Sequence, residues 1–152
     1  RNVDDALARE VAAQGGVIQI NSVFLSRFNN SAARSPLYDQ LDEIDHLTPD
    51  QQRRLAADWA VLDRTERVNE GDLALFMRAL LHCIEVVCVD HCGVGADWDG
   101  GGGVAGLDDV TALPRITAAL MAAGYSEADV DKIWSGNILR VMRQVEAAAA
   151  RR

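Results

Sequence analysis

The sequence has few basic residues, few aromatic residues and no long apolar run, and these shortages exclude several classes of function. Lysine and arginine total 15 against 23 aspartates and glutamates, which gives a net charge of -8, and no basic cluster is longer than a pair. Nucleic acids and anionic membranes need a positive surface, so neither is expected as a partner. No apolar stretch approaches the roughly 20 residues of a transmembrane segment. We therefore expect a soluble protein that acts on a small ligand.

The chain also lacks an initiator methionine and the basic-then-apolar order of a secretory signal, because it begins with Arg1. We expect it to start within a longer protein, cytoplasmic or exported, and the sequence does not specify the compartment. Its cysteines, Cys83, Cys88 and Cys92, fit neither a paired zinc motif nor an even disulfide framework. We interpret them as small buried hydrophobic residues.

Hydrophobic periodicity predicts an alternation of helices and short strands. Apolar residues at helical spacing predict helices over residues 3–14, 49–63, 72–87, 113–123 and 126–134, and a last one after Gly136. Two apolar runs, 17–23 and 91–97, predict buried strands. Asn2 is expected to cap the first helix, and Gly136 to separate the last two.

The order of these elements is typical of a βα repeat, so the predicted fold class is α/β. Two strands cannot close a barrel or cover the apolar faces of all these helices. We therefore infer one domain over residues 1–152 that is an incomplete part of a larger (β/α)8 barrel. Residues 24–70 within it are too long for a simple connection, and they are interpreted as a functional loop or an excursion with short helices.

The most informative segment is DHCGVGADWDGGGG, residues 90–103. It places Asp97 at the end of the second predicted strand, where (β/α)8 enzymes carry catalytic groups. Gly93 and Gly95 share its face and leave room for a ligand or a bulky neighbour. An acid after an apolar strand is as often a helix N-cap, so the residues alone leave both roles of Asp97 open.

Other interpretations of polar residues in and around this segment have less support. Asp99 either orients the glycine loop by accepting backbone N–H bonds or touches a substrate, and the loop role is favoured. A calcium-binding EF-hand is disfavoured because Gly101 stands at the fifth position and no glutamate at the twelfth, and phosphate binding is disfavoured because the P-loop Lys and Ser/Thr are absent. His46, His82 and His91 lack metal-ligand spacing, and His82 is expected on an exposed helix face.

Three stretches resemble the membrane (renal) dipeptidase family of zinc metallo-dipeptidases. Residues 90–103 are similar to its GADWDGGGG segment, and the similarity extends over residues 114–146. The N-terminal RNVxD is similar to its RN(V/L)xD signature, and GVIQIN, residues 16–21, to the strand that follows. The middle of the chain matches weakly. Cys88 stands where relatives commonly have glycine, which indicates strain or drift at a helix end.

The resemblance implies the C-terminal part of a (β/α)8 barrel of the metal-dependent hydrolase type, in a protein about twice this length. It implies hydrolysis of dipeptides, with a D-residue possible on the C-terminal side, by a water that two zinc ions activate. The family's zinc ligands lie upstream of this chain. No residue here is therefore expected to bind metal, and the chain alone is expected to be inactive. Family members are often homodimers.

The resemblance also implies roles for individual residues. The family aspartate that matches Asp97 shuttles a proton toward the leaving amine, which makes Asp97 the catalytic candidate. The arginine that matches Arg1 holds the substrate carboxylate, a role that suits a planar guanidinium. Asn21 and Asp99 are the further substrate-binding candidates. The alternative is a non-catalytic half or pseudoenzyme that only associates with a partner, and an upstream His-x-Asp region in the same gene would discriminate the two.

Overall fold

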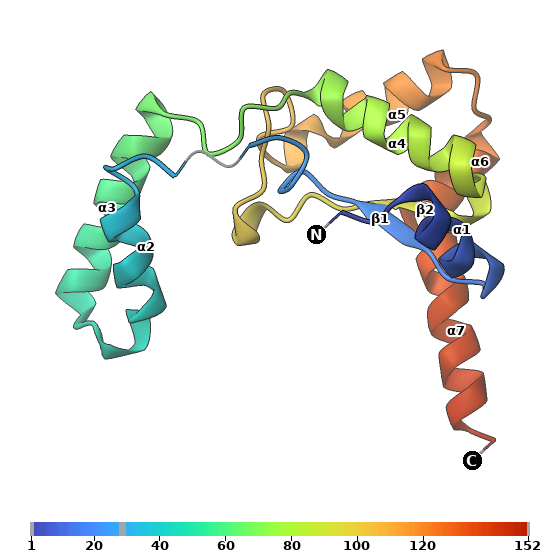
Figure 1. Ribbon diagram of the computed structural model, residues 1–152, viewed down its shortest axis with the longest axis horizontal. Helices are drawn as coiled ribbons and strands as arrows, with labels where there is room; N and C mark the ends of the chain where they lie inside the picture. Colours follow the sequence, from blue (N-terminus) through green and yellow to red (C-terminus); the bar gives the residue numbers. More distant parts are fainter. Residues whose placement is uncertain (1, 28–29, 152) are drawn as a thin grey trace.

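The computed structural model describes residues 2–27 and 30–151, apart from the side chain of Asp99. The helices and strands are α1 (Asp5–Ala13), β1 (Ile18–Ile20), α2 (Ser35–Asp42), α3 (Pro49–Thr65), α4 (Leu73–Val87), β2 (Cys92–Val94), α5 (Leu113–Ala122), α6 (Glu127–Asp131) and α7 (Asn137–Ala149). Short 3-10 turns cover Ile44–His46, Val89–His91, Trp98–Gly100 and Val110–Ala112, and a π-helical turn covers Lys132–Gly136. In Figure 1, α2 and α3 form a helical arm apart from the other elements, which gather around the two strands. Within the described ranges, no helix has the length and apolar character needed to cross a membrane.

The two strands pair in parallel, with Gln19 opposite Gly93. Parallel pairing needs a crossover connection, and the chain between the strands supplies one that includes α4. The predicted α/β class is thus what the structure shows. The predicted extents of both strands were wrong, because β1 ends at Ile20 and β2 at Val94. Asp97 lies beyond β2, and its left-handed backbone (φ 58°, ψ 41°) is incompatible with a strand.

The start of α1 also differs from the prediction. Its N-cap is Asp4, whose carboxylate accepts a hydrogen bond from the Leu7 N–H at 2.8 Å. Asn2, the predicted cap, instead donates its side-chain amide to the carbonyl of Phe24 at 3.2 Å. Aspartate and asparagine cap equally well, so local sequence could not choose between the two positions.

Gly136 does not separate the last two helices, contrary to the prediction. Its backbone is helical (φ -55°, ψ -43°), and the chain continues from α6 through the π-helical turn into α7. The reason lies in a tertiary contact of the next residue. The buried Asn137 amide donates to the carbonyls of Val89 and Cys92 at 2.7 and 2.8 Å, which fixes the helix against β2. Such contacts offset the roughly 1 kcal/mol that a mid-helix glycine costs.

The core lies around α4, whose predicted apolar face is confirmed. Its buried side chains are Phe76, Met77, Leu80, Cys83, Ile84 and Val87. They form one cluster with Cys92 of β2 and with Ile116 and Leu120 of α5. The interpretation of the cysteines as buried residues is confirmed for Cys83 and Cys92, whose sulfurs lie 2.8 Å apart. It was wrong for Cys88, which is exposed because it terminates the helix.

Cys88 has the strained backbone that its place in the sequence indicated. Its φ of 62° and ψ of 169° fall in a region that is essentially restricted to glycine and costs about 1–3 kcal/mol. Glycine would relieve the strain but loses about 0.5–1 kcal/mol more chain entropy on folding. We therefore expect Cys88→Gly to raise the free energy of unfolding by about 1 kcal/mol, measured by urea denaturation. Cys88→Ala is the control, and an equal gain from it would assign the effect to the thiol instead.

The segment 24–70 is an excursion with helices rather than an irregular loop. Its arm is held together by Arg34, which is fully buried before α2. The guanidinium lies 2.9 Å from the Asp63 carboxylate, and it donates to the carbonyl of Glu66 at 2.6 Å. Trp59 packs over the same guanidinium and contacts Tyr38 edge-on. A buried cation needs such partners, so this pairing joins α2 to α3.

Candidate functional site

The candidate site is the loop of residues 95–103 that follows β2. Asp97 is exposed in this loop, in the left-handed conformation that aspartate tolerates better than most residues. Although it stands at the N-cap position of the Trp98–Gly100 turn, its side chain makes no capping hydrogen bond. The sequence left open whether Asp97 is an N-cap. In this structure its carboxylate does not cap the turn.

The glycines of the loop allow the backbone to fold tightly around Asp97. The N–H groups of Gly100 and Gly102 both donate to the Asp97 carbonyl, at 3.1 and 2.7 Å. A Cβ added at Gly102 would lie far below 3.0 Å from the carbonyl oxygens of Ala96 and Asp97. A Cβ at Gly100 would overlap the Asp97 carboxylate in the same way, so this carboxylate lies over Gly100. Close approach of the backbone to itself thus requires glycine at Gly102, whereas Gly101 and Gly103 have positive φ angles of 92° and 111° that favour glycine.

The two glycines around β2 have a simpler explanation. A Cβ at Gly93 would lie 3.2 Å from Cγ of Gln19 and 3.4 Å from the carbonyl of Ile133. The sequence predicted that glycine leaves room either for a ligand or for a bulky neighbour. At Gly93 the room is taken by a neighbour, Gln19. At Gly95, a Cβ would meet Cβ of Asn21 at an ordinary 3.7 Å.

The predicted substrate-binding residues are only partly described. Arg1 lies outside the described residues, and of Asp99 only the backbone is described, within the Trp98–Gly100 turn. Asn21 is half-buried just after β1 and beside Gly95. Its Oδ1 accepts a hydrogen bond from the Val23 N–H at 3.1 Å, as in a local turn. The structure thus brings Asn21 to the start of the Asp97 loop.

Two further residues contact the Asp97 loop, and sequence reasoning missed both. The side chains of Ser22 and Asn69 are buried and form hydrogen bonds with the loop backbone. Ser22 follows Asn21 directly at the end of the resembling strand, which was a usable signal. Asn69 lies in the weakly matching middle of the chain, where neither motif nor periodicity distinguishes it.

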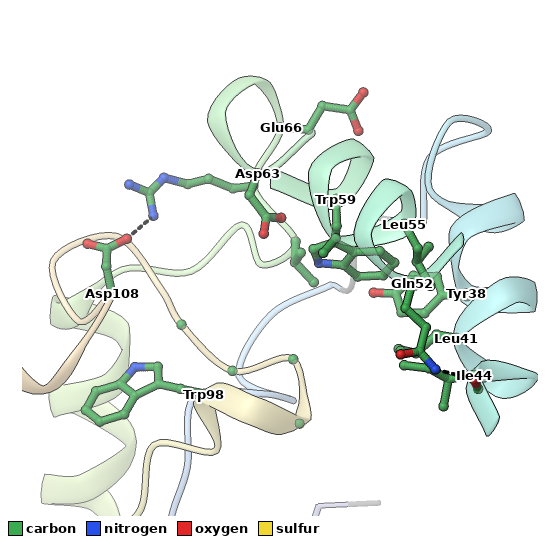
Figure 2. Close-up of a pocket in the computed structure, with 17 residues that line it drawn as sticks. Tyr38, Leu41, Ile44, Gln52, Leu55, Trp59, Asp63, Glu66, Trp98 and Asp108 are labelled. Carbon is green, nitrogen blue, oxygen red and sulfur yellow. Dashed lines mark hydrogen bonds and ion pairs between the residues drawn. The ribbon is translucent and has the colours of Figure 1, made fainter. Parts of the chain in front are cut away.

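A cavity of about 630 Å³ lies between the Asp97 loop and the helical arm. Figure 2 shows Tyr38 and Trp59 of the arm on one side of it and Trp98 of the loop on the other. An ion pair closes part of its rim, with Arg67 Nη1 2.7 Å from Oδ1 of Asp108. The volume is in the range of small-molecule sites. Burial raises the pKa of Tyr38 in this cavity.

A second cavity of about 470 Å³ lies between α1, β1 and α4, and Asn21 and His82 line it. His82 is exposed, as predicted, and its Nε2 lies 2.9 Å from a carboxylate oxygen of Asp5. The hydrogen bond to Asp5, followed by the carboxylate charge, raises the pKa of His82. This pair holds α1 to α4 at the exposed edge of the cavity.

The described residues do not fit a metal site. Among them, no group of three or more His, Cys, Asp or Glu side chains could hold an ion. His91, for example, is half-buried and bonds through Nδ1 to the carbonyl of Gly16 at 2.7 Å. The described part of the chain can therefore offer an acid, hydrogen-bond groups and a cavity, but no ligand cluster for zinc.

Comparison with known proteins shows the family to which the chain belongs. The sequence model of the membrane dipeptidases (Peptidase family M19) matches residues 1–152. The chain belongs to the membrane dipeptidase family. The resemblance seen in the sequence motifs is thereby confirmed. The match includes the middle of the chain, where the motifs alone gave little similarity.

Curated members of the membrane dipeptidase family are similar to parts of the chain. Dipeptidase ataJ of Aspergillus terreus is 45% identical over 73 residues, which are 47% of this chain and 18% of that protein. Dipeptidase 3 of Mus musculus is 36% identical over 126 residues, which are 78% of this chain and 25% of that protein. The chain thus spans a quarter or less of the length of these relatives.

Two solved dipeptidase structures share the fold of this family member. The probable dipeptidase PvdM from Pseudomonas aeruginosa matches with a TM-score of 0.62 and 28% identity, over 92% of this chain and 40% of that chain. A metallo peptidase from Rhodobacter sphaeroides, liganded with a phosphinate mimic of the dipeptide L-Ala-D-Ala, matches with a TM-score of 0.56 and 25% identity, over 90% of this chain and 29% of that chain. These matches support the α/β class, and they do not favour the interpretation of the chain as a non-catalytic half.

Proposed function

We propose that this member of the membrane dipeptidase family hydrolyses dipeptides and that Asp97 is the acid that transfers protons in the reaction. The observation that carries the proposal is the exposure and position of the Asp97 carboxylate. It is exposed, it makes no capping bond, and it stands on a tightly folded glycine loop beyond a parallel strand. Catalytic groups in α/β folds occupy this end of the strands.

In the proposed reaction the Asp97 carboxylate first accepts a proton from the attacking water. At the same time the water oxygen bonds to the peptide carbonyl carbon. The protonated carboxyl then gives this proton to the amide nitrogen as the C–N bond breaks, and an amine leaves with the new carboxylic acid behind. One group can serve in both steps because each returns it to the state that the other needs. Exposure of Asp97 lets a substrate approach it.

We propose that the metal of the parent enzyme is a pair of zinc ions held by residues outside 1–152. The described residues provide no ligand cluster, so the contribution of this chain is proton transfer and substrate binding. In the same proposal, residues 1–152 form the C-terminal part of a (β/α)8 barrel domain that includes the excursion 24–70. Assembly as a homodimer stays a prediction.

Substrate binding is assigned to Arg1, Asn21 and Asp99. Arg1 would hold the C-terminal carboxylate of the dipeptide by two parallel hydrogen bonds. Because Oδ1 of Asn21 is engaged by the Val23 N–H, Asn21 would bind substrate through its Nδ2 group. A D-residue on the C-terminal side is proposed because a solved relative carries a mimic of L-Ala-D-Ala.

The protein encoded by the whole gene provides the test. We expect it to hydrolyse L-Ala-L-Ala and L-Ala-D-Ala, with kcat/KM at least about tenfold lower for the C-terminal amides, since these lack the carboxylate that Arg1 would bind. Release of alanine, measured by chromatography, checks both results. Absence of dipeptide turnover would sink the proposed function, whereas equal rates on the amides would remove only the role of Arg1.

A further inference from the structure

Two buried side chains from distant parts of the sequence hold the loop that carries Asp97. Ser22, just after β1, and Asn69, before α4, are 0% and 1% exposed. Within the described part of the chain, the side-chain hydrogen bonds of both residues go only to backbone groups of residues 96–103. Asp97 lies between the points that they bind. The placement suggests that they act on the position of this residue.

The Ser22 hydroxyl joins the two ends of the loop. It donates to the carbonyl of Ala96 at 2.6 Å and accepts from the N–H of Gly103 at 2.7 Å. A hydroxyl has one proton to donate and lone pairs to accept, so both bonds form at once. One oxygen atom therefore connects the residue before Asp97 to the residue that closes the loop.

The Asn69 carboxamide binds the loop at two carbonyls. Its Nδ2 donates to the carbonyls of Gly101 and Gly103, at 2.9 and 3.1 Å, which uses both amide protons. Its Oδ1 is buried without a hydrogen-bond partner among the described residues. The two bonds to the loop are the side-chain hydrogen bonds that Asn69 makes to the described residues, so its buried carboxamide is engaged with the loop.

The segment that follows Asn69 is itself fixed to the chain just beyond the loop. The backbone of Gly71 accepts from the N–H of Ala105 at 3.1 Å, and its own N–H donates to Oγ of Ser26 at 2.9 Å. Asp72 and Ala105 form a parallel bridge. Ser22 and Asn69 thus come from two separate supports, the end of β1 and the segment before α4.

We propose that Ser22 and Asn69 are positioning residues that set the place of the Asp97 carboxylate for proton transfer. This inference rests on the proposed function, because it assigns the effect to Asp97. A glycine-rich loop has little stiffness of its own, so hydrogen bonds from a rigid scaffold must define it. A misplacement of about 1 Å can lower a rate a hundredfold, and partial loosening of the loop is expected to cost about tenfold.

The experiment is a double-mutant cycle in the complete enzyme. We expect Ser22→Ala and Asn69→Ala each to lower kcat about tenfold with KM within about twofold. In the Asp97→Asn background the same substitutions should change kcat little, because the group they position is already lost. Backbone hydrogen exchange of residues 96–105 should also be faster in both variants. Ser126→Ala is the control, since it removes a capping hydroxyl from α6 without touching the loop.

Each result separates this inference from the proposed function. Undiminished effects of the two substitutions in the Asp97→Asn background would show a general structural role and overturn the inference alone. Unchanged kcat in both single variants, with Asp97→Asn inactive, would also overturn it alone. If Asp97→Asn retains the normal kcat, the proposed role of Asp97 fails as well. Should Ser22→Ala not fold, Ser22→Cys keeps a slightly larger side chain with a weak S–H donor in place of the hydroxyl, which weakens both bonds, and the same readings apply.

Discussion

Replacement of Asp97 by asparagine is expected to lower kcat for dipeptide hydrolysis by roughly 100- to 10,000-fold, the usual effect of losing a general acid or base. Asparagine keeps the size and shape of the side chain but cannot carry the proton. Since Asp97 makes no capping hydrogen bond, the substitution should leave the melting temperature and the zinc content of the complete enzyme unchanged. Steady-state kinetics and metal analysis of the purified variant check these expectations.

Two other aspartates provide matched controls for this experiment. Asp109 caps a 3-10 turn through the N–H of Thr111 at 2.8 Å, and asparagine caps as well as aspartate, so Asp109→Asn should leave kcat unchanged and stability nearly so. Asp99→Asn should cost much less than Asp97→Asn, because Asp99 carries no proton in the proposed reaction. If Asp97→Asn keeps a normal kcat, Asp97 is not the proton carrier. If the substitution removes the zinc, Asp97 is a metal ligand.

The second large effect is expected from a single added methyl group at Gly102. The Cβ of alanine would overlap the carbonyl oxygens of Ala96 and Asp97, and both are backbone atoms that cannot rotate away. The loop must therefore open and displace Asp97. We expect Gly102→Ala to lower kcat at least about 100-fold and to destabilise the fold by about 1–3 kcal/mol. Kinetics and thermal unfolding measure the two effects.

Gly136→Ala is the matched control, because it adds the same methyl group at a position with room for it. Its Cβ would lie 3.4 Å from the carbonyl of Asp131, and its backbone is helical. Alanine is favoured over glycine in a helix by about 0.5–1 kcal/mol, so this variant should be slightly more stable and fully active. Normal activity of Gly102→Ala would mean that the loop geometry does not govern the reaction.

Much of the arrangement could be predicted because it depends on local patterns. The apolar face of residues 72–87 required burial whatever its partner, and α4 indeed forms the centre of the core. The strain at Cys88 was visible because a non-glycine residue stood at a helix end where relatives have glycine. The glycine run after Asp97 indicated a tight loop, although not which atoms require it.

The incorrect predictions arise where tertiary contacts outweigh local preference. Gly136 is a helix terminator by composition, yet the bonds of Asn137 to the 3-10 turn after α4 and to β2 keep the chain helical. The run to Asp97 has strand character, yet pairing with β1 ends at Val94. Pattern rules do not see such contacts, because the partners lie far away in sequence.

By itself, the sequence determined the α/β class and the family resemblance and indicated Asp97 as the catalytic candidate, since these depend on periodicity and on a contiguous motif. Only the tertiary structure decided that Asp97 makes no cap, and that Ser22 and Asn69 hold its loop. Ser22 and Gly103 are 81 residues apart, and Asn69 and Gly103 are 34 apart. A hydrogen bond depends on distance in space, and the fold alone brings residues so distant in the chain within 3 Å or so of each other.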